Sequence, residues 1–160
     1  EELKRVGVTG IFLGYYLPWD GYGNALYAQA HGFETYHKTV EGSLVNYENL
    51  DNVQTGIHDY FKFLKYGFGR ATDLACLHVR RGRLLREDAI RLVKIHDGKF
   101  PWVYLGCPIE EVMKEIGMTM DEFIRVCDRF TNRKLFVCDA RGIPVKDRDG
   151  NLKKINDDNA

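Results

Sequence analysis

The feature that most constrains the fold is a helix, a glycine turn and a second helix, predicted around residues 56–73 (GIHDYFKFLKYGFGRATD). Apolar side chains recur at spacings of three and four residues, which predicts one continuous core-facing side on the first helix, at residues 52–66. These side chains are Val53, Ile57, Tyr60, Phe61, Leu64 and Phe68. Gly67 and Gly69 flank one aromatic residue, and this pattern favours positive φ and close backbone approach. The second helix is expected at residues 70–81.

Periodicity and capping signals predict further helices on both sides of this stretch. They are expected at residues 20–32, 86–96, 108–116 and 119–130. Asp20 is placed to cap the first of them. Thr119 and Glu122 form a capping-box pattern at the start of the last. Most of the predicted regular secondary structure is therefore helical.

Short apolar runs predict a small number of strands. Residues 11–15 fit a buried strand better than a helix of that length, and residues 34–38 are a second short candidate. Residues 135–146 and 152–155 have the pattern of a hairpin around the turn at 147–151. The predicted fold class is α+β and predominantly helical, with strands near the N-terminus and a C-terminal hairpin.

The first predicted strand indicates a larger parent protein. A strand buried on both faces needs parallel neighbours, and this chain offers few of them. We therefore expect a fragment of a larger α/β protein. Residues 1–51 would end the parent's sheet region, residues 52–130 would be helical, and residues 131–160 would form a C-terminal hairpin or tail. At 160 residues these regions are expected to share one compact unit.

Charge is distributed unevenly, although the net charge of the chain is zero. Residues 1–61 carry 3 basic and 8 acidic side chains, residues 62–106 carry 10 and 4, and residues 107–160 carry 10 and 11. The middle third is thus a basic region rich in arginine, whose fork of donors suits phosphate or carboxylate. A solvated helix surface explains the same charges equally well.

Two positions are candidates for ligand binding on local grounds. Arg70 opens a helix whose free backbone N–H groups favour an anion, and either a bound anion or Asp73 would offset a cation placed there. Asp20 follows the predicted strand at its carboxyl end, where open α/β sheets usually bind ligands. Both observations favour a binding site without naming its ligand.

Other patterns exclude several kinds of site. His58 and Asp59 are adjacent on a helix and point about 100° apart, so they are not expected to form an acid–base dyad. The five histidines have no metal-ligand spacing, and no metal site is predicted. No apolar run approaches the roughly 20 residues of a membrane-spanning helix. The four cysteines include no C-x-x-C pair, which favours reduced thiols in a cytoplasmic protein.

Five runs of the sequence resemble the C-terminal part of the bacterial N-acetyl sugar amidotransferases of lipopolysaccharide O-antigen biosynthesis. They lie at residues 10–33, 36–43, 47–51, 56–73 and 130–136, and they include GIFLGYYLPWDGYGNALYAQAHGF and GIHDYFKFLKYGFGRATD. The resemblance covers nearly the whole chain, and several of the shared sequence segments are long and uncommon. That family is in turn similar to the PP-loop ATP pyrophosphatases.

The resemblance implies an activity and its partners. Members are expected to activate the N-acetyl group of a free or nucleotide-linked sugar by adenylation, with ATP and Mg²⁺. Ammonia from a glutaminase and an ammonia-channel subunit then gives an acetamidino group. The family's serine-glycine-glycine-x-aspartate-serine loop for ATP does not occur in this sequence. The resemblance thus implies a fragment that binds no cofactor and is inactive alone, and it leaves a homo-oligomer open.

The resemblance also implies roles for the basic region, which would face the ATP and sugar-nucleotide crevice. Lys62, Lys65 and Arg70 are the first candidates for stabilising the negative charge that amide activation creates. Asp73 is expected to orient Arg70. The diphosphate contact is assigned to Arg80 or Arg81. Further candidates for the site are His58, Asp59 and Asp20. No catalytic residue is assigned.

Two other functions remain open from the sequence. Related PP-loop enzymes modify tRNA, and an arginine-rich region suits a phosphate backbone, so a nucleic-acid-binding helical module is one alternative. The absence of an overall basic balance and of a nucleic-acid motif argues against it. The other alternative is a module that docks the ammonia-supplying partner.

Overall fold

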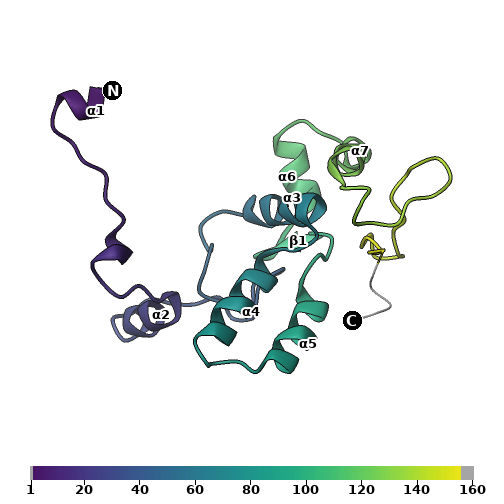
Figure 1. Ribbon diagram of the computed structural model, residues 1–160. Coiled ribbons are helices and arrows are strands. Elements are labelled where there is room, and N and C mark those ends of the chain that lie inside the picture. Colours follow the sequence, from purple (N-terminus) through teal and green to yellow (C-terminus); the bar gives the residue numbers. More distant parts are fainter. Residues whose placement is uncertain (1, 156–160) are drawn as a thin grey trace. The chain divides into compact units, whose positions relative to one another are not determined.

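The structure is a computed structural model that describes residues 2–155 (Figure 1). It contains two compact units, Glu1–Thr35 and Tyr36–Ala160. The boundary between these units lies at residues 35 and 36, whereas the regions predicted from the sequence were divided at residues 51 and 130. A single compact unit was expected from the length of the chain. The assignment of regions to a parent protein stays a prediction.

The first unit contains short helices and no strand among its described residues. It comprises α1 (Glu2–Arg5), a 3₁₀ turn η1 (Leu13–Tyr15) and α2 (Gly21–Gln29). The Asp20 carboxylate accepts a hydrogen bond from the Tyr22 backbone N–H at 3.3 Å, so the predicted cap of α2 is confirmed.

The predicted strand at residues 11–15 is wrong. The backbone N–H groups of Tyr15 and Tyr16 donate to the carbonyl oxygens of Phe12 and Leu13 at 3.0 Å, which closes a local turn. Apolar composition favoured a strand, but a strand needs a neighbour for its backbone groups, and none lies beside it within the described part of the first unit. The predicted strand at residues 34–38 is also wrong, since this segment is irregular.

The second unit is built around α3 (Thr55–Tyr66), which contacts both α7 (Met120–Phe130) and the short strand β1 (Val103–Tyr104). Helices α4 (Arg70–Arg80) and α5 (Arg86–His96) pack against each other as a pair. Helix α6 (Ile109–Glu115) packs on α7. The predicted helices of this region are therefore confirmed, with ends that differ by at most three residues.

The core of the second unit is mostly aromatic and aliphatic. Its buried members are Tyr60, Phe63, Leu64, Phe100, Ile109, Val112, Met113, Phe123, Cys127, Phe136 and Leu152. The helical face predicted from the sequence supplies Tyr60 and Leu64 to this cluster, and Phe61 packs against it. Phe68, expected on the same face, is 40% exposed because the helix ends at Tyr66. The predicted capping box of Thr119 and Glu122 is confirmed at the start of α7.

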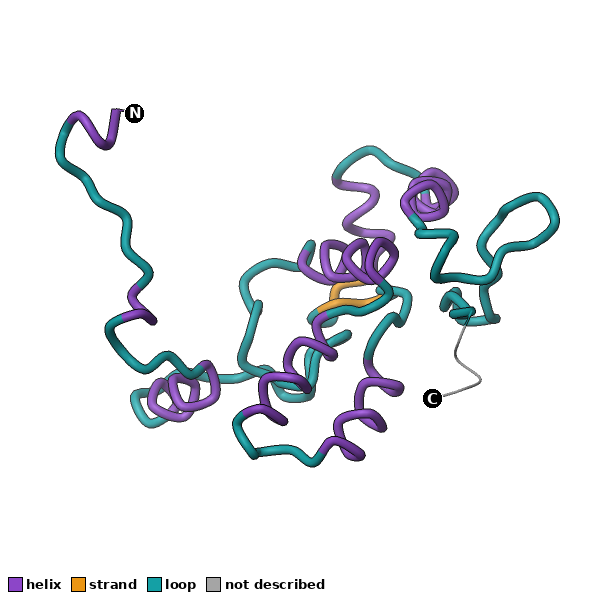
Figure 2. The backbone as a smooth tube through the Cα atoms, viewed as in Figure 1, coloured by secondary structure: helices purple, strands orange, loops and turns teal. Residues whose placement is uncertain are grey.

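Strands are few and short in the described residues (Figure 2). Strand β1 pairs with β2 (Cys107–Pro108) as an antiparallel hairpin, in a segment for which the sequence predicts no strand. Isolated antiparallel bridges join Phe136 to Lys154 and Lys146 to Leu152, which confirms the predicted pairing around the turn at 147–151. The fold class is confirmed as predominantly helical α+β, with its strands in the C-terminal half of the chain.

Candidate functional site

A cavity of about 360 Å³ lies in the second unit, between the start of α3, the start of α4 and the segment that leads from α5 to β1. Its apolar wall is formed mainly by the ring side chains of Tyr60, Phe63, Phe100, Trp102 and Tyr104. Its charged lining comes from Glu41, Asp59, Arg70, Asp97 and Lys99, with His96 beside them. We call this the Arg70 cavity. Its size is that of a small-molecule site, which is typically about 300–1,000 Å³.

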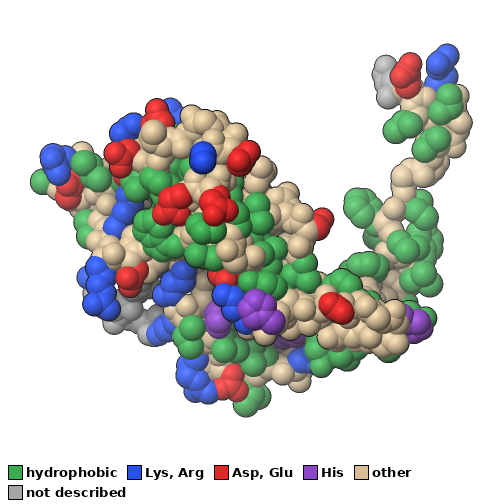
Figure 3. Space-filling model, turned by 180° about the vertical axis from the view of Figure 1, so that it is seen from behind, with side chains coloured by type: hydrophobic (Ala, Val, Ile, Leu, Met, Phe, Trp, Pro, Cys, Tyr) green, Lys and Arg blue, Asp and Glu red, His purple; other side chains and the backbone are tan. Residues whose placement is uncertain are grey.

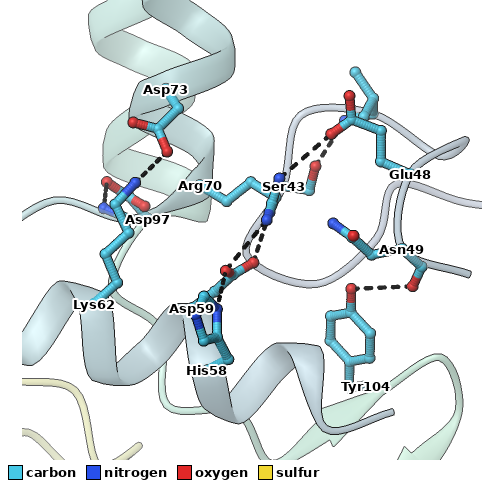
Figure 4. Close-up of polar contacts among 12 residues, drawn as sticks. Ser43, Glu48, Asn49, His58, Asp59, Lys62, Arg70, Asp73, Asp97 and Tyr104 are labelled. Atoms are coloured by element: carbon cyan, nitrogen blue, oxygen red, sulfur yellow. Dashed lines mark hydrogen bonds and ion pairs between the residues drawn. The ribbon is translucent and has the colours of Figure 1, made fainter. Parts of the chain in front are cut away.

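Arg70 holds three separate segments together at the edge of this cavity (Figure 4). Its Nε donates to Asp59 Oδ2 of α3 at 2.7 Å, and its Nη1 lies 3.5 Å from Glu48 Oε2 in the preceding loop. Burial alone would lower the pKa of Arg70, but the hydrogen bond and charge of Asp59 outweigh it and raise the pKa above its ordinary value. Two carboxylates therefore neutralise the guanidinium, which weakens the prediction that it awaits an anion.

The N-terminus of α4 already has an anionic partner from within the chain. The Asp97 carboxylate, at the end of α5, accepts from the Gly69 backbone N–H at 2.9 Å and from Thr72 Oγ1 at 2.5 Å. The negative charge also complements the helix dipole at this end. The feature that sequence analysis interpreted as a ligand anion site is thus filled by Asp97.

The glycine turn before α4 has the two properties that the sequence predicts. Gly67 ends α3 with a φ of 75°, in the left-handed region. Gly69 permits close approach, because a Cβ there would lie 2.4 Å from Asp97 Oδ1. The turn therefore seats the start of α4 directly against the end of α5.

The lysines predicted to act with Arg70 do not line the Arg70 cavity. Lys62 forms an ion pair with Asp73, and its Nζ lies 4.8 Å from the centre of the Phe68 ring. Lys65 is exposed, with its Nζ 5.1 Å from the centre of the Phe130 ring. The partner of Arg70 is thus Asp59, and the partner of Asp73 is Lys62.

Arg80, Arg81 and Asp20 were also predicted to contribute to the site. Arg80 and Arg81 are exposed at the C-terminal end of α4. Asp20 caps α2 in the first unit. None of these three residues lines the Arg70 cavity.

His58 and Asp59 correct one sequence-based expectation. His58 Nδ1 lies 3.1 Å from Asp59 Oδ1, although neighbouring helical positions point in different directions. Rotation about the side-chain bonds brings the two groups together despite the angle between their Cβ atoms. The His58 side chain is 78% exposed, so the contact stands at the surface, whereas Asp59 is only 12% exposed and faces Arg70.

Sequence reasoning missed Tyr104, Glu48 and the role of Asp97. The Tyr104 hydroxyl donates to the Asn49 carbonyl oxygen at 3.4 Å. Burial and then the charge of Asp59 raise the pKa of Tyr104 to about 12, so the hydroxyl keeps its proton. Asp97 lies just after the helix predicted at residues 86–96, and no local pattern in the sequence singled out any of these three residues for the site.

The structure offers no metal centre among residues 2–155, where no group of three or more His, Cys, Asp and Glu side chains is placed to hold an ion. The four cysteines are free thiols. Burial first, and then the charge of Asp128, raise the pKa of Cys127 to about 12, so this thiol is unreactive. In the same described residues, no helix has the length and apolar content to cross a membrane.

Comparison with known proteins identifies a family. A family model described as "LPS biosynthesis protein WbpG-like, C-terminal domain" matches residues 31–146. The match includes the whole Arg70 cavity and all of α3 to α7. A search of curated proteins gave no match.

Proposed function

Because the chain belongs to the WbpG-like C-terminal domain family of LPS biosynthesis proteins, we propose that it is part of an ATP-dependent amidotransferase of O-antigen biosynthesis. Family membership supports a role in lipopolysaccharide biosynthesis. The proposed reaction converts the N-acetyl group of a sugar to an acetamidino group. The chain's contribution is the Arg70 cavity, which receives the N-acetyl part of the sugar.

The observation that carries this proposal is the combination of aromatic walls and one fixed polar pair in the Arg70 cavity. Sugar rings present apolar C–H faces that pack on aromatic side chains, and their hydroxyl and amide groups need directed hydrogen bonds. Trp102 is held in place because its Nε1 donates to the Asp149 carbonyl oxygen at 2.7 Å. The Arg70 and Asp59 side chains fix each other's position through their hydrogen bond of 2.7 Å, so these groups are in place before a substrate binds.

Arg70 is the proposed donor to the acetyl oxygen. Its Nε and Nη2 face Asp59 at 2.7 and 3.4 Å, and its Nη1 faces Glu48. A guanidinium carries five N–H donors, so these contacts leave donors for a substrate. Negative charge grows on the acetyl oxygen during amide activation, and a preorganised N–H donor aimed at that oxygen stabilises the charge.

The acidic side chains that line the Arg70 cavity disfavour binding of the ATP phosphates there. Arg70 already faces two carboxylates, Asp97 occupies the helix N-terminus, and Lys62 is paired with Asp73. Bringing a triphosphate to this lining would place it beside Asp59 and Asp97, where like charges repel. We therefore propose that ATP and Mg²⁺ bind to other parts of the complete protein, with the sugar amide between the two regions.

The reaction itself is testable with the complete protein. Supplied with ATP, Mg²⁺, free ammonium and a panel of nucleotide-linked N-acetyl sugars, it is expected to replace one acetyl oxygen by nitrogen. The oxygen leaves with AMP, so AMP, pyrophosphate and the acetamidino sugar should form in equal amounts. Mass spectrometry of the sugar and chromatography of the nucleotides measure this. Formation of ADP, or no modified sugar from any substrate with glutaminase and channel subunits present, would contradict the proposal.

The exposed apolar surface of the first unit favours docking of the ammonia-supplying partner as a second candidate function. Hydrophobic side chains cover much of the surface of this unit's N-terminal segment (Figure 3). They include Ile11, Phe12, Tyr15, Tyr16, Leu17 and Trp19, each more than half exposed. An apolar patch of this kind is typical of protein contact surfaces. If the first unit docks the ammonia-supplying partner, glutamine would support acetamidino-sugar formation only when that partner is present. Free ammonium would support the same reaction in the absence of the partner.

A further inference from the structure

A second concavity, of about 340 Å³, is lined mainly by arginine. Its lining residues are Arg125, Asp128, Arg129, Arg133, Arg141, Gly142, Ile143 and Pro144. The first three lie on α7, and the others lie in the segment that follows it. It shares no lining residue with the Arg70 cavity. We call it the arginine concavity.

Its one acidic lining residue is already neutralised. Asp128 is paired with Lys146, and both side chains are 22% exposed. Asp139, just outside the lining, faces Arg141 with distances of 3.4 Å from its Oδ2 to Nε and to Nη2. After these pairs, the lining keeps an excess of positive charge, whereas acidic side chains outnumber basic ones in the lining around Arg70.

Two of the arginines are not held by a hydrogen bond or an ion pair within the described chain, although Arg125 lies near enough to Glu122 for their charges to attract. Neither Arg125 nor Arg129 makes a hydrogen bond or ion pair with a residue of 2–155, and the Arg129 guanidinium only rests 5.5 Å from the centre of the Phe130 ring. They lie one helical turn apart, so their charges repel each other. An anion in the concavity would offset this repulsion.

The other two arginines are held in position by the loop at residues 139–143. Asp139 Oδ1 accepts from the backbone N–H groups of Arg141 and Ile143, both at 2.9 Å, which fixes a tight turn. Arg133 Nε donates to the Gly142 carbonyl oxygen at 3.1 Å and leaves the end of its guanidinium available. Donors fixed in this way lose little entropy when a ligand binds.

We propose that the arginine concavity binds the diphosphate group of a small ligand. Four guanidinium groups around one hollow match a group with several oxygens and more than one negative charge, since each fork can meet two oxygens. A concave site of this volume suits a small molecule better than the extended stripe that a polynucleotide backbone requires. The inference does not rest on the proposed amidation, because it concerns other residues.

Titration calorimetry of the chain with inorganic pyrophosphate tests this site. We expect pyrophosphate to bind with an affinity that falls as salt is added. Arg125→Ala and Arg133→Ala should each lower this affinity by about tenfold or more, the scale of one lost charge-assisted hydrogen bond. Arg125 makes no hydrogen bond or ion pair in the described chain, so we expect its removal to leave the fold intact. Arg91→Ala is the matched control, because Arg91 pairs with Asp88 on α5 and is expected to leave affinity unchanged.

Further arms of the experiment identify the source of the diphosphate. If UDP-N-acetylglucosamine binds more tightly than pyrophosphate and competes with it for the site, the result would support a nucleotide sugar as the ligand. Equal affinities would support a free diphosphate. The inference is overturned if pyrophosphate does not bind at millimolar concentration, if Arg125→Ala leaves its affinity unchanged, or if a single-stranded oligoribonucleotide binds more tightly and displaces it. Arg70→Ala should leave pyrophosphate binding unchanged, which separates this site from the Arg70 cavity.

Discussion

Arg70→Ala in the complete protein is expected to lower the rate of acetamidino-sugar formation by about 100-fold or more, the scale seen when a preorganised donor to a developing oxyanion is removed. Arg70 lines the cavity and is fixed by Asp59 and Glu48, so its position relative to a bound substrate is defined. Under the proposed function its loss removes the hydrogen-bond donor to the acetyl oxygen. Initial rates with saturating ATP and ammonium measure the effect.

Arg70 also has a structural role, so the variant needs controls. Removing it leaves Asp59, which is 12% exposed, with only the exposed His58 ring as a partner, and breaking a largely buried ion pair in this way destabilises a fold by about 3–5 kcal/mol. The double variant Asp59→Asn with Arg70→Ala removes that charge, and it should recover thermal stability while remaining inactive. Arg91→Ala on α5 should keep normal turnover. Near-normal turnover in a folded Arg70→Ala protein contradicts the assigned role.

Gly98→Ala is expected to destabilise the chain by about 2–5 kcal/mol, the sum of left-handed backbone strain and an overpacked core. Gly98 has a φ of 69°, and a Cβ at this position would lie 2.1 Å from Cζ of Phe63. Phe63 is 4% exposed and packs in the core, so it cannot move aside freely. The free energy of unfolding, measured by chemical denaturation of the chain, gives the effect.

Gly82→Ala supplies the matched control. Gly82 has a φ of 66°, close to that of Gly98, but no atom lies within 4 Å of the position of its Cβ. This variant carries the backbone strain alone, about 1–2 kcal/mol. If Gly98→Ala destabilises the chain no more than Gly82→Ala does, Phe63 does not pack against Gly98 as described.

The helices of the second unit were predictable because their signals are local. Apolar periodicity marked α3, Thr119 and Glu122 marked the start of α7, and Gly67 marked the end of α3. Each of these signals acts within one or two helical turns. The strand predicted at residues 11–15 failed because strand formation depends on a neighbour that the local sequence does not specify.

The candidate site was predictable only in part, because its contacts join distant segments. The sequence singled out Arg70, but it could not show that Asp59 and Glu48 would meet it or that Asp97 would reach the start of α4 across 28 positions. Carboxylates brought by the fold thus changed Arg70 from a free cation into one half of a neutralised pair.

The arginine concavity could not be predicted from the sequence, because the fold gathers charges there that are mixed with opposite charges along the chain. Residues 107–160 carry 10 basic and 11 acidic side chains, so this region appeared neutral in the sequence. The fold separates these charges, and Arg125, Arg129, Arg133 and Arg141 gather around one hollow. A net charge counted along the chain does not record such a separation.

The central claim, that the Arg70 cavity forms part of the sugar site, is tested most directly by hydrogen–deuterium exchange of the complete protein. Exchange is compared with and without the N-acetyl sugar that serves as substrate. We predict slower exchange of the backbone N–H groups of residues 69–72 and 97–104, which contribute to or adjoin the cavity, and unchanged exchange in α6. Unchanged exchange in both cavity segments at saturating sugar would contradict the claim.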